Sequence, residues 1–79
     1  MLQRVVKILA DILIVDERSI SPDMPLSESS GIRPIDVAKL VIRTEEAYSI
    51  TIHDEDVPSL KTIGAFCAYV QEIREGTRD

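Results

Sequence analysis

The chain has 79 residues, of which 44% are hydrophobic and 29% charged, and its formal net charge is −5. This length corresponds to one domain over residues 1–79. The negative charge disfavours nucleic-acid binding, because phosphates are repelled. The single cysteine excludes an internal disulfide, and no apolar run approaches the roughly 20 residues that span a bilayer. We therefore expect a cytoplasmic, monomeric domain that has no signal peptide and does not insert into membranes.

Apolar residues at helical spacing predict an amphipathic helix over residues 2–14. The stripe consists of Leu2, Val5, Val6, Leu9, Ile12 and Leu13, and is widened by Ile8 and Ile14. Residues 15–33 are rich in turn formers and predict a long loop. Isolated apolar residues in it, Ile20, Met24 and Leu26, are expected to pin the loop onto the helices.

A proline marks the start of the second predicted helix, over residues 34–48. Pro34 suits the first helical position, because the N–H that it lacks has no partner there. Arg33 should be extended, as residues before proline are. The spacing predicts an inner stripe of Ile35, Ala38, Val41 and Ile42. Asp36, Lys39 and Arg43 share another face, with a partly exposed Leu40 beside it.

The rest of the chain predicts an extended link and two further helical segments. Ile50 and Ile52 are expected to be buried, and residues 54–57 to form a short turn limited by Pro58. Thr62 is a suitable N-cap for a last helix that runs to about Arg74. Three main helices, one short helix and one long loop predict a small all-α four-helix bundle.

Several blocks of the sequence resemble acyl carrier proteins, in register over nearly the whole chain. The blocks are Leu9-Ala10-Asp11 through Val15-Asp16-Glu17, Ile20-Ser21-Pro22-Asp23, Glu45-Glu46-Ala47-Tyr48, Ile50-Thr51-Ile52, Asp54-Glu55-Asp56 and Thr62-Ile63-Gly64. The resemblance implies the small four-helix acyl-carrier fold, with its long loop between the first two helices.

The resemblance also identifies a functional position at the start of the second helix. Acyl carrier proteins hold Gly-x-Asp-Ser-Leu-Asp there, and the serine carries 4′-phosphopantetheine. Here the motif reads Gly31-Ile32-Arg33-Pro34-Ile35-Asp36. Pro34 has no oxygen that would attack coenzyme A, so we expect no cofactor. The alternative is a working carrier with 4′-phosphopantetheine on Ser29 or Ser30, if the loop places one of them at the helix start.

The charge of the second helix departs from the family as well. Over residues 33–48, Arg33, Lys39 and Arg43 balance Asp36, Glu45 and Glu46, whereas the family's helix is usually acidic. One interpretation is a different protein partner, because electrostatic complementarity governs specificity. The other is a solvated face on which Asp36 pairs with Lys39 and Arg43 with Glu46.

No catalytic centre or metal site is expected. His53 lacks further ligands, and Cys67 lies on the apolar stripe of the last helix, where a buried thiol is the ordinary outcome. The prediction is a non-enzymatic binding or accessory module. The resemblance implies protein partners among acyl-transfer or synthase enzymes of fatty-acid, polyketide or peptide biosynthesis. Its predicted partner-binding residues are Arg33, Ile35, Asp36, Lys39, Leu40 and Arg43.

A third hypothesis is a non-covalent fatty-acid binder. The resemblance supports it, because family members hold an acyl chain among their helices. The ordinary alternative is a filled core. A continuous apolar cavity that reaches the surface near Pro34 would favour lipid binding, and a close-packed interior would exclude it.

Overall fold

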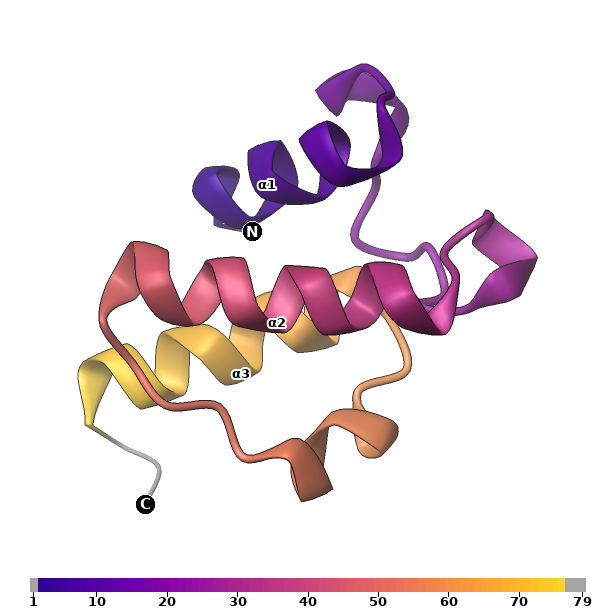
Figure 1. Cartoon of the computed structure of the whole chain (residues 1–79). Helices are drawn as coiled ribbons and strands as arrows, with labels where there is room; N and C mark the ends of the chain where they lie inside the picture. The colour runs from indigo at the N-terminus through magenta and orange to yellow at the C-terminus, as the bar shows by residue number, and fades with distance from the viewer. Residues whose placement is uncertain (1, 77–79) are drawn as a thin grey trace.

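The computed structural model describes residues 2–76, which form an all-helical bundle. Its elements are α1 (Gln3–Leu13), η1 (Glu17–Ser19), η2 (Glu28–Ser30), α2 (Pro34–Tyr48), η3 (Asp54–Ser59) and α3 (Ile63–Glu75), of which the η elements are 3₁₀ helices. In Figure 1, α1 lies on one side of α2, and α3 runs beside α2 in the same direction. The predicted bundle is confirmed, with η3 as its short fourth helix.

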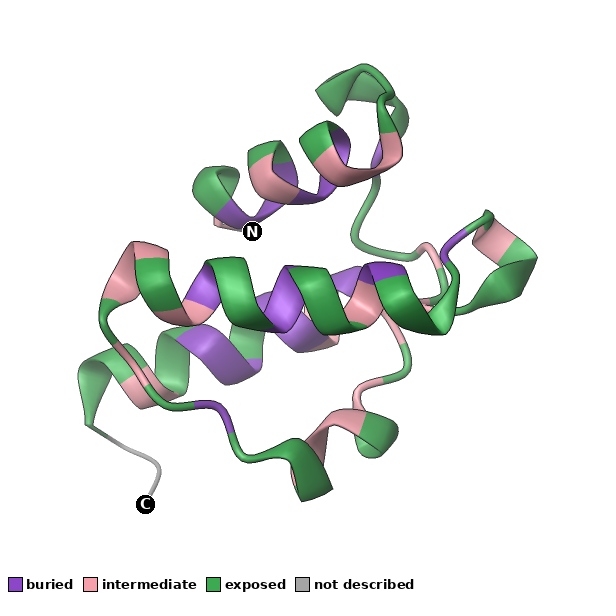
Figure 2. Cartoon of the chain, viewed as in Figure 1, coloured by how far each residue is buried: buried purple, intermediate pink, exposed green. Residues whose placement is uncertain are grey.

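The core is built from one face of each α-helix and a few loop residues. Figure 2 shows the buried positions on the helical faces that meet one another. Phe66 of α3 is fully buried, as are Leu9 of α1 and Leu40 of α2. Cys67 is 2% exposed, which confirms the predicted buried thiol. Burial raises the pKa of this thiol, so it stays protonated and unreactive at neutral pH.

The end of α1 differs from its prediction. The chain turns at Ile14, whose φ of 57° is left-handed. The Val15 N–H then donates to the Ala10 carbonyl at 3.0 Å and closes the helix. The turn removes Ile14 from the helical face and leaves it 90% exposed. The expectation that Ile14 widens the buried stripe is therefore wrong.

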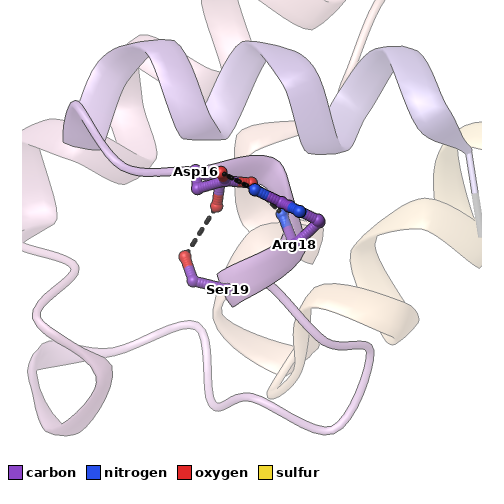
Figure 3. Close-up of polar contacts among 3 residues, drawn as sticks. All are labelled: Asp16, Arg18 and Ser19. Atoms are coloured by element: carbon purple, nitrogen blue, oxygen red, sulfur yellow. Dashed lines mark hydrogen bonds and ion pairs between the residues drawn. The ribbon is translucent and has the colours of Figure 1, made fainter.

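The turn after α1 is organised by Asp16. Its carboxylate accepts from the Arg18 backbone N–H at 2.8 Å and pairs with the Arg18 guanidinium at 2.9 Å, while the Ser19 hydroxyl donates to the Asp16 carbonyl (Figure 3). The Arg18 side chain lowers the pKa of Asp16. Because both side chains are solvent-exposed, we expect this pair to shape η1 locally and to contribute little to global stability.

The long loop is tied to the start of α3. Ile20 is buried, and Met24 and Leu26 pack partly buried against the core, which confirms that these residues pin the loop. The Ile63 and Gly64 N–H groups donate to the carbonyls of Met24 and Pro22, each at 3.0 Å. Pro25 and Thr62 form an isolated bridge, and the described residues contain no strand. The loop thus joins the bundle through its backbone as well as its side chains.

Polar contacts fix η3 to α3. The Tyr69 hydroxyl donates to Asp56 at 2.9 Å and accepts from the His53 N–H at 3.2 Å. Ile52 is buried and Ile50 is partly buried, as predicted. The predicted turn continues one residue past Pro58, to Ser59. Within residues 2–76, no helix combines the length and the apolar composition needed to cross a membrane.

Candidate functional site at the start of α2

The turn into α2 is set by a glycine and a buried isoleucine. Gly31 adopts a φ of 78°, which glycine accepts without strain. Ile32 is 1% exposed and anchors the next residue of the turn in the core. Arg33 is extended, with φ −80° and ψ 159°, and Pro34 is the first residue of α2. The helix start predicted from the proline is confirmed.

A compact ion pair closes this helix start. The Asp36 carboxylate accepts from the Arg33 backbone N–H at 2.9 Å and from its guanidinium at 3.1 and 3.2 Å. Arginine has no side-chain acceptor, so only the reach-back half of a capping box forms. The Arg33 side chain, and then its backbone N–H, hold the pKa of Asp36 below its ordinary value, and the pKa of Arg33 is raised. The carboxylate thereby offsets the unfavourable position of a cation at a helix N-terminus.

Hydroxyl groups are present before the helix but not at its first residue. Ser27 precedes η2, and Ser29 and Ser30 belong to it. The Ser27 and Ser29 hydroxyls share a hydrogen bond of 2.9 Å, and the Ser30 N–H donates to the Ser27 carbonyl. Pro34 offers no side-chain oxygen. The start of α2 therefore does not fit a prosthetic group attached there through oxygen.

An apolar groove runs beside Pro34. It has a volume of about 890 Å³ and is bordered by the long loop, the start of α2, and η3. A second hollow of about 470 Å³ shares Pro34, Val37, Val57 and Pro58 with it and continues along α2. The groove is lined by Pro25, Leu26, Ser27, Glu28, Ser29, Ile32, Pro34, Val37, Val57, Pro58 and Lys61. Its walls are mostly apolar, and Glu28 and Lys61 are the ionisable residues among them.

The face that α2 buries differs from the predicted inner stripe. Its buried residues are Asp36, Leu40, Val41 and Thr44. Of the predicted stripe only Val41 is buried, because Ile35 and Ile42 are each 57% exposed and Ala38 is exposed. Apolar residues lie on several sides of this helix, so periodicity alone did not determine which side meets α1 and α3.

Because α2 buries a different face than predicted, some of the predicted partner-binding residues are exposed and others are buried. Arg33, Ile35, Lys39 and Arg43 are exposed, and their contact with a partner stays a prediction. Leu40 is fully buried and Asp36 is 2% exposed, so their assignment to a docking surface is wrong. Asp36 instead closes the helix start, and Leu40 lies in the core.

The structure adds residues that sequence reasoning missed. Ala38 and Ile42 are exposed on α2, and Val37, Val57 and Lys61 line the groove. The groove residues come from separate segments, so no local pattern marked them. His53 caps the start of η3 through its backbone position. Within residues 2–76, no group of three or more His, Cys, Asp or Glu side chains is placed to hold a metal ion.

A comparison with protein families agrees with the fold described above. Residues 3–70 match the family model described as "Phosphopantetheine attachment site". The match begins at the first residue of α1 and extends into α3, so it includes both the turn into α2 and the groove. The chain therefore belongs to the phosphopantetheine attachment site family and is a member with the acyl carrier protein fold.

Proposed function

We propose that this domain is a non-catalytic binding module that carries no prosthetic group. The observation that supports it most directly is Pro34 at the first residue of α2, where the resemblance places the attachment serine. The adjacent Arg33 is engaged with Asp36. The helix start is thus completed by an ion pair and a proline, and neither supplies the oxygen nucleophile that attachment requires.

The serines before the helix are poor substitutes. Ser29 and Ser30 lie in η2 and are separated from α2 by Gly31, Ile32 and Arg33. The buried side chain of Ile32 fixes this spacing. A transferase that recognises the first turn of α2 would meet Pro34 and the exposed Ile35 rather than a hydroxyl.

Intact-mass measurement after co-expression with a broad-specificity phosphopantetheinyl transferase tests the absence of the group. We expect no phosphopantetheine-sized gain for the native chain. The matched positive control is the double variant Arg33→Asp, Pro34→Ser, which restores the family residues and should gain the mass. A gain in the native chain that disappears in Ser29→Ala, Ser30→Ala would establish the alternative, a working carrier.

The family and the exposed surface of α2 support the proposed accessory role. Members of this family operate with partner proteins, and residues 35, 38, 39, 42 and 43 of α2 remain accessible here. We propose partners among acyl-transfer or synthase enzymes of fatty-acid, polyketide or peptide biosynthesis. In such an assembly, the domain would occupy a carrier's place without transferring an acyl group.

The groove favours a second candidate, non-covalent binding of a fatty acyl chain. Its apolar walls reach the surface beside Pro34, and Lys61 is among its lining residues, so its ammonium is the candidate partner of a carboxylate head group. Calorimetric titration with saturated fatty acids of increasing length tests it. Val37→Glu places a charge in the groove and should abolish binding, whereas Ile35→Glu, outside the groove, should not. The absence of binding heat, together with unchanged amide resonances of the groove residues, would exclude this candidate.

A further inference from the structure

The acidic residues of α2 are largely withdrawn from its surface. The sequence of this helix region is balanced in charge, but the Asp36 carboxylate is buried against Arg33. Glu45 is partly buried, and its carboxylate accepts from the Ile52 N–H at 2.8 Å. Only Glu46, in the last turn, remains as an exposed acid on α2. Since Asp36 compensates the charge of Arg33, the exposed and otherwise uncompensated charges of α2 are Lys39 and Arg43 against Glu46.

The exposed surface of α2 combines this charge with apolar side chains. We use the name α2 basic face for Ile35, Ala38, Lys39, Ile42 and Arg43, all exposed. Ile35, Ala38 and Ile42 follow one another at helical spacing, and both isoleucines are 57% exposed. Lys39 and Arg43, one turn apart on the same side, form no ion pair within the described part of the chain. The predicted pairs Asp36–Lys39 and Arg43–Glu46 are therefore not formed.

On the basis of the proposed binding function, we propose that the α2 basic face docks on a partner protein whose surface has an apolar depression bordered by carboxylates. The depression would remove Ile35 and Ile42 from water, and the carboxylates would pair with Lys39 and Arg43. Partly exposed isoleucines stabilise a complex only when they are covered, and buried cations require counter-charges.

The charge of the whole chain sets the orientation of this docking. The net charge is −5, so an acidic partner is repelled by most of the surface and attracted by the α2 basic face. Salt screens electrostatic interactions beyond about 8 Å at physiological ionic strength. Once the two surfaces are close, the attraction to Lys39 and Arg43 therefore outweighs the repulsion from distant acidic residues. A membrane is a weaker fit, because two unpaired cations on a net acidic domain give little attraction to anionic lipids.

Zero-length cross-linking tests the chemistry of the partner. A carbodiimide joins a lysine amine to a carboxylate as an amide, and the reagent takes up the water that is lost. The chain has three lysines, Lys7 on α1, Lys39 on α2 and Lys61 before α3, so they report on different surfaces. The tagged full chain, incubated in extract of its source cells, should couple through Lys39 to Asp or Glu of a captured protein.

Matched charge variants complete the experiment. Lys39→Glu, Arg43→Glu should lose the captured protein. Lys7→Glu, Arg18→Glu has the same net charge and should retain it, and circular dichroism verifies that both variants fold. Coupling of the partner through Lys7 or Lys61 would overturn this inference and leave the binding function standing. Capture of no protein would overturn both.

Two further arms exclude other occupants of the face. If the native chain bound phosphatidylglycerol vesicles and Lys39→Glu, Arg43→Glu did not, the face would be a membrane site and the inference would be wrong. If sedimentation showed a dimer that the same variant dissociated, the occupant would be a second copy. We expect no vesicle binding and a monomer.

Discussion

The starts of α2 and α3 are built in different ways. The start of α3 is held by a distant part of the chain as well as by its own cap. The Thr62 hydroxyl accepts from the Ala65 N–H at 3.0 Å. The N–H groups of Ile63 and Gly64 donate to carbonyls of the long loop. The start of α2 is local, because the hydrogen bonds that hold residues 30–37 stay within residues 27–37. Its one deep tertiary anchor is the side chain of Ile32.

This difference determines how far each helix start tolerates substitution. A substitution at the start of α3 disturbs the loop packed against it. At the start of α2, Arg33 and Pro34 are exposed, and Asp36 reaches back to the Arg33 backbone N–H, a bond that any residue except proline would allow. The first residues of α2 are therefore positions where residues can change without loss of the helix.

The largest expected change in stability is at Ile32, the buried anchor of the α2 start, and it contrasts with the exposed Ile35 beside it. Ile32→Ala removes a fully packed side chain and should lower the free energy of unfolding by about 2–5 kcal/mol. Ile35→Ala, at a position 57% exposed, should change it by no more than about 0.5 kcal/mol. Urea denaturation followed by circular dichroism measures both. Similar losses for the two variants would show that α2 docks in another register.

Two glycines test the contrast between tertiary and local constraint. A Cβ on Gly64 would lie 3.0 Å from the carbonyl oxygen of Pro22, so Gly64→Ala should destabilise by about 1–3 kcal/mol, as overpacking does. A Cβ on Gly31 meets nothing within 4 Å, and only its φ of 78° opposes substitution. Gly31→Ala should therefore cost about 1–2 kcal/mol, from backbone strain alone. In the double variant Gly31→Ala, Ile35→Ala, the two losses of unfolding free energy should add, because neither residue is confined by packing.

The cap of α3 should have a smaller effect. Thr62→Ala removes the acceptor of the Ala65 N–H and should lower the unfolding free energy by about 1 kcal/mol. Thr62→Ser keeps the acceptor and is the matched control. Equal stability of the alanine and serine variants in thermal unfolding would mean that the loop contacts alone hold this helix start.

Local signals predicted the starts of α2 and α3, and the absence of such signals explains the errors elsewhere. Pro34 and Thr62 are stereochemical markers that act within one turn, so both helix starts were predicted correctly. The register of α2 depends on contacts with two other helices, and its several apolar sides left that register open. Thr44 is fully buried with no hydrogen-bond partner for its hydroxyl in the described structure, a position that no polarity pattern would assign to a core. The groove is formed by the long loop, the start of α2 and η3, with Lys61 after it, and was predicted only as a condition for lipid binding.

The smallest expected effect is the pH dependence of the stability that the Arg33–Asp36 pair contributes at the start of α2. The Asp36 pKa is lowered chiefly by Arg33, with a lesser contribution from Lys39, so its ionised form stabilises the fold above the ordinary pKa of about 4. This contribution is lost as pH falls through the lowered pKa. The stability deficit of Arg33→Ala relative to the native chain should therefore be full at neutral pH and shrink below about pH 4.

The contribution of Asp16 to the pH-dependent stability must be separated from that of Asp36, because Arg18 lowers the pKa of Asp16 as well. Arg18→Ala should therefore give a deficit with the same sign of pH dependence, whereas Lys7→Ala, at an exposed position of α1, should give none. In Arg18→Ala, Arg33→Ala the two deficits should add, since the pairs share no residue. If the deficit of Arg33→Ala stayed constant from pH 7 to pH 2, the Arg33 side chain would act through packing. The helix start would then not depend on the ion pair between Arg33 and Asp36.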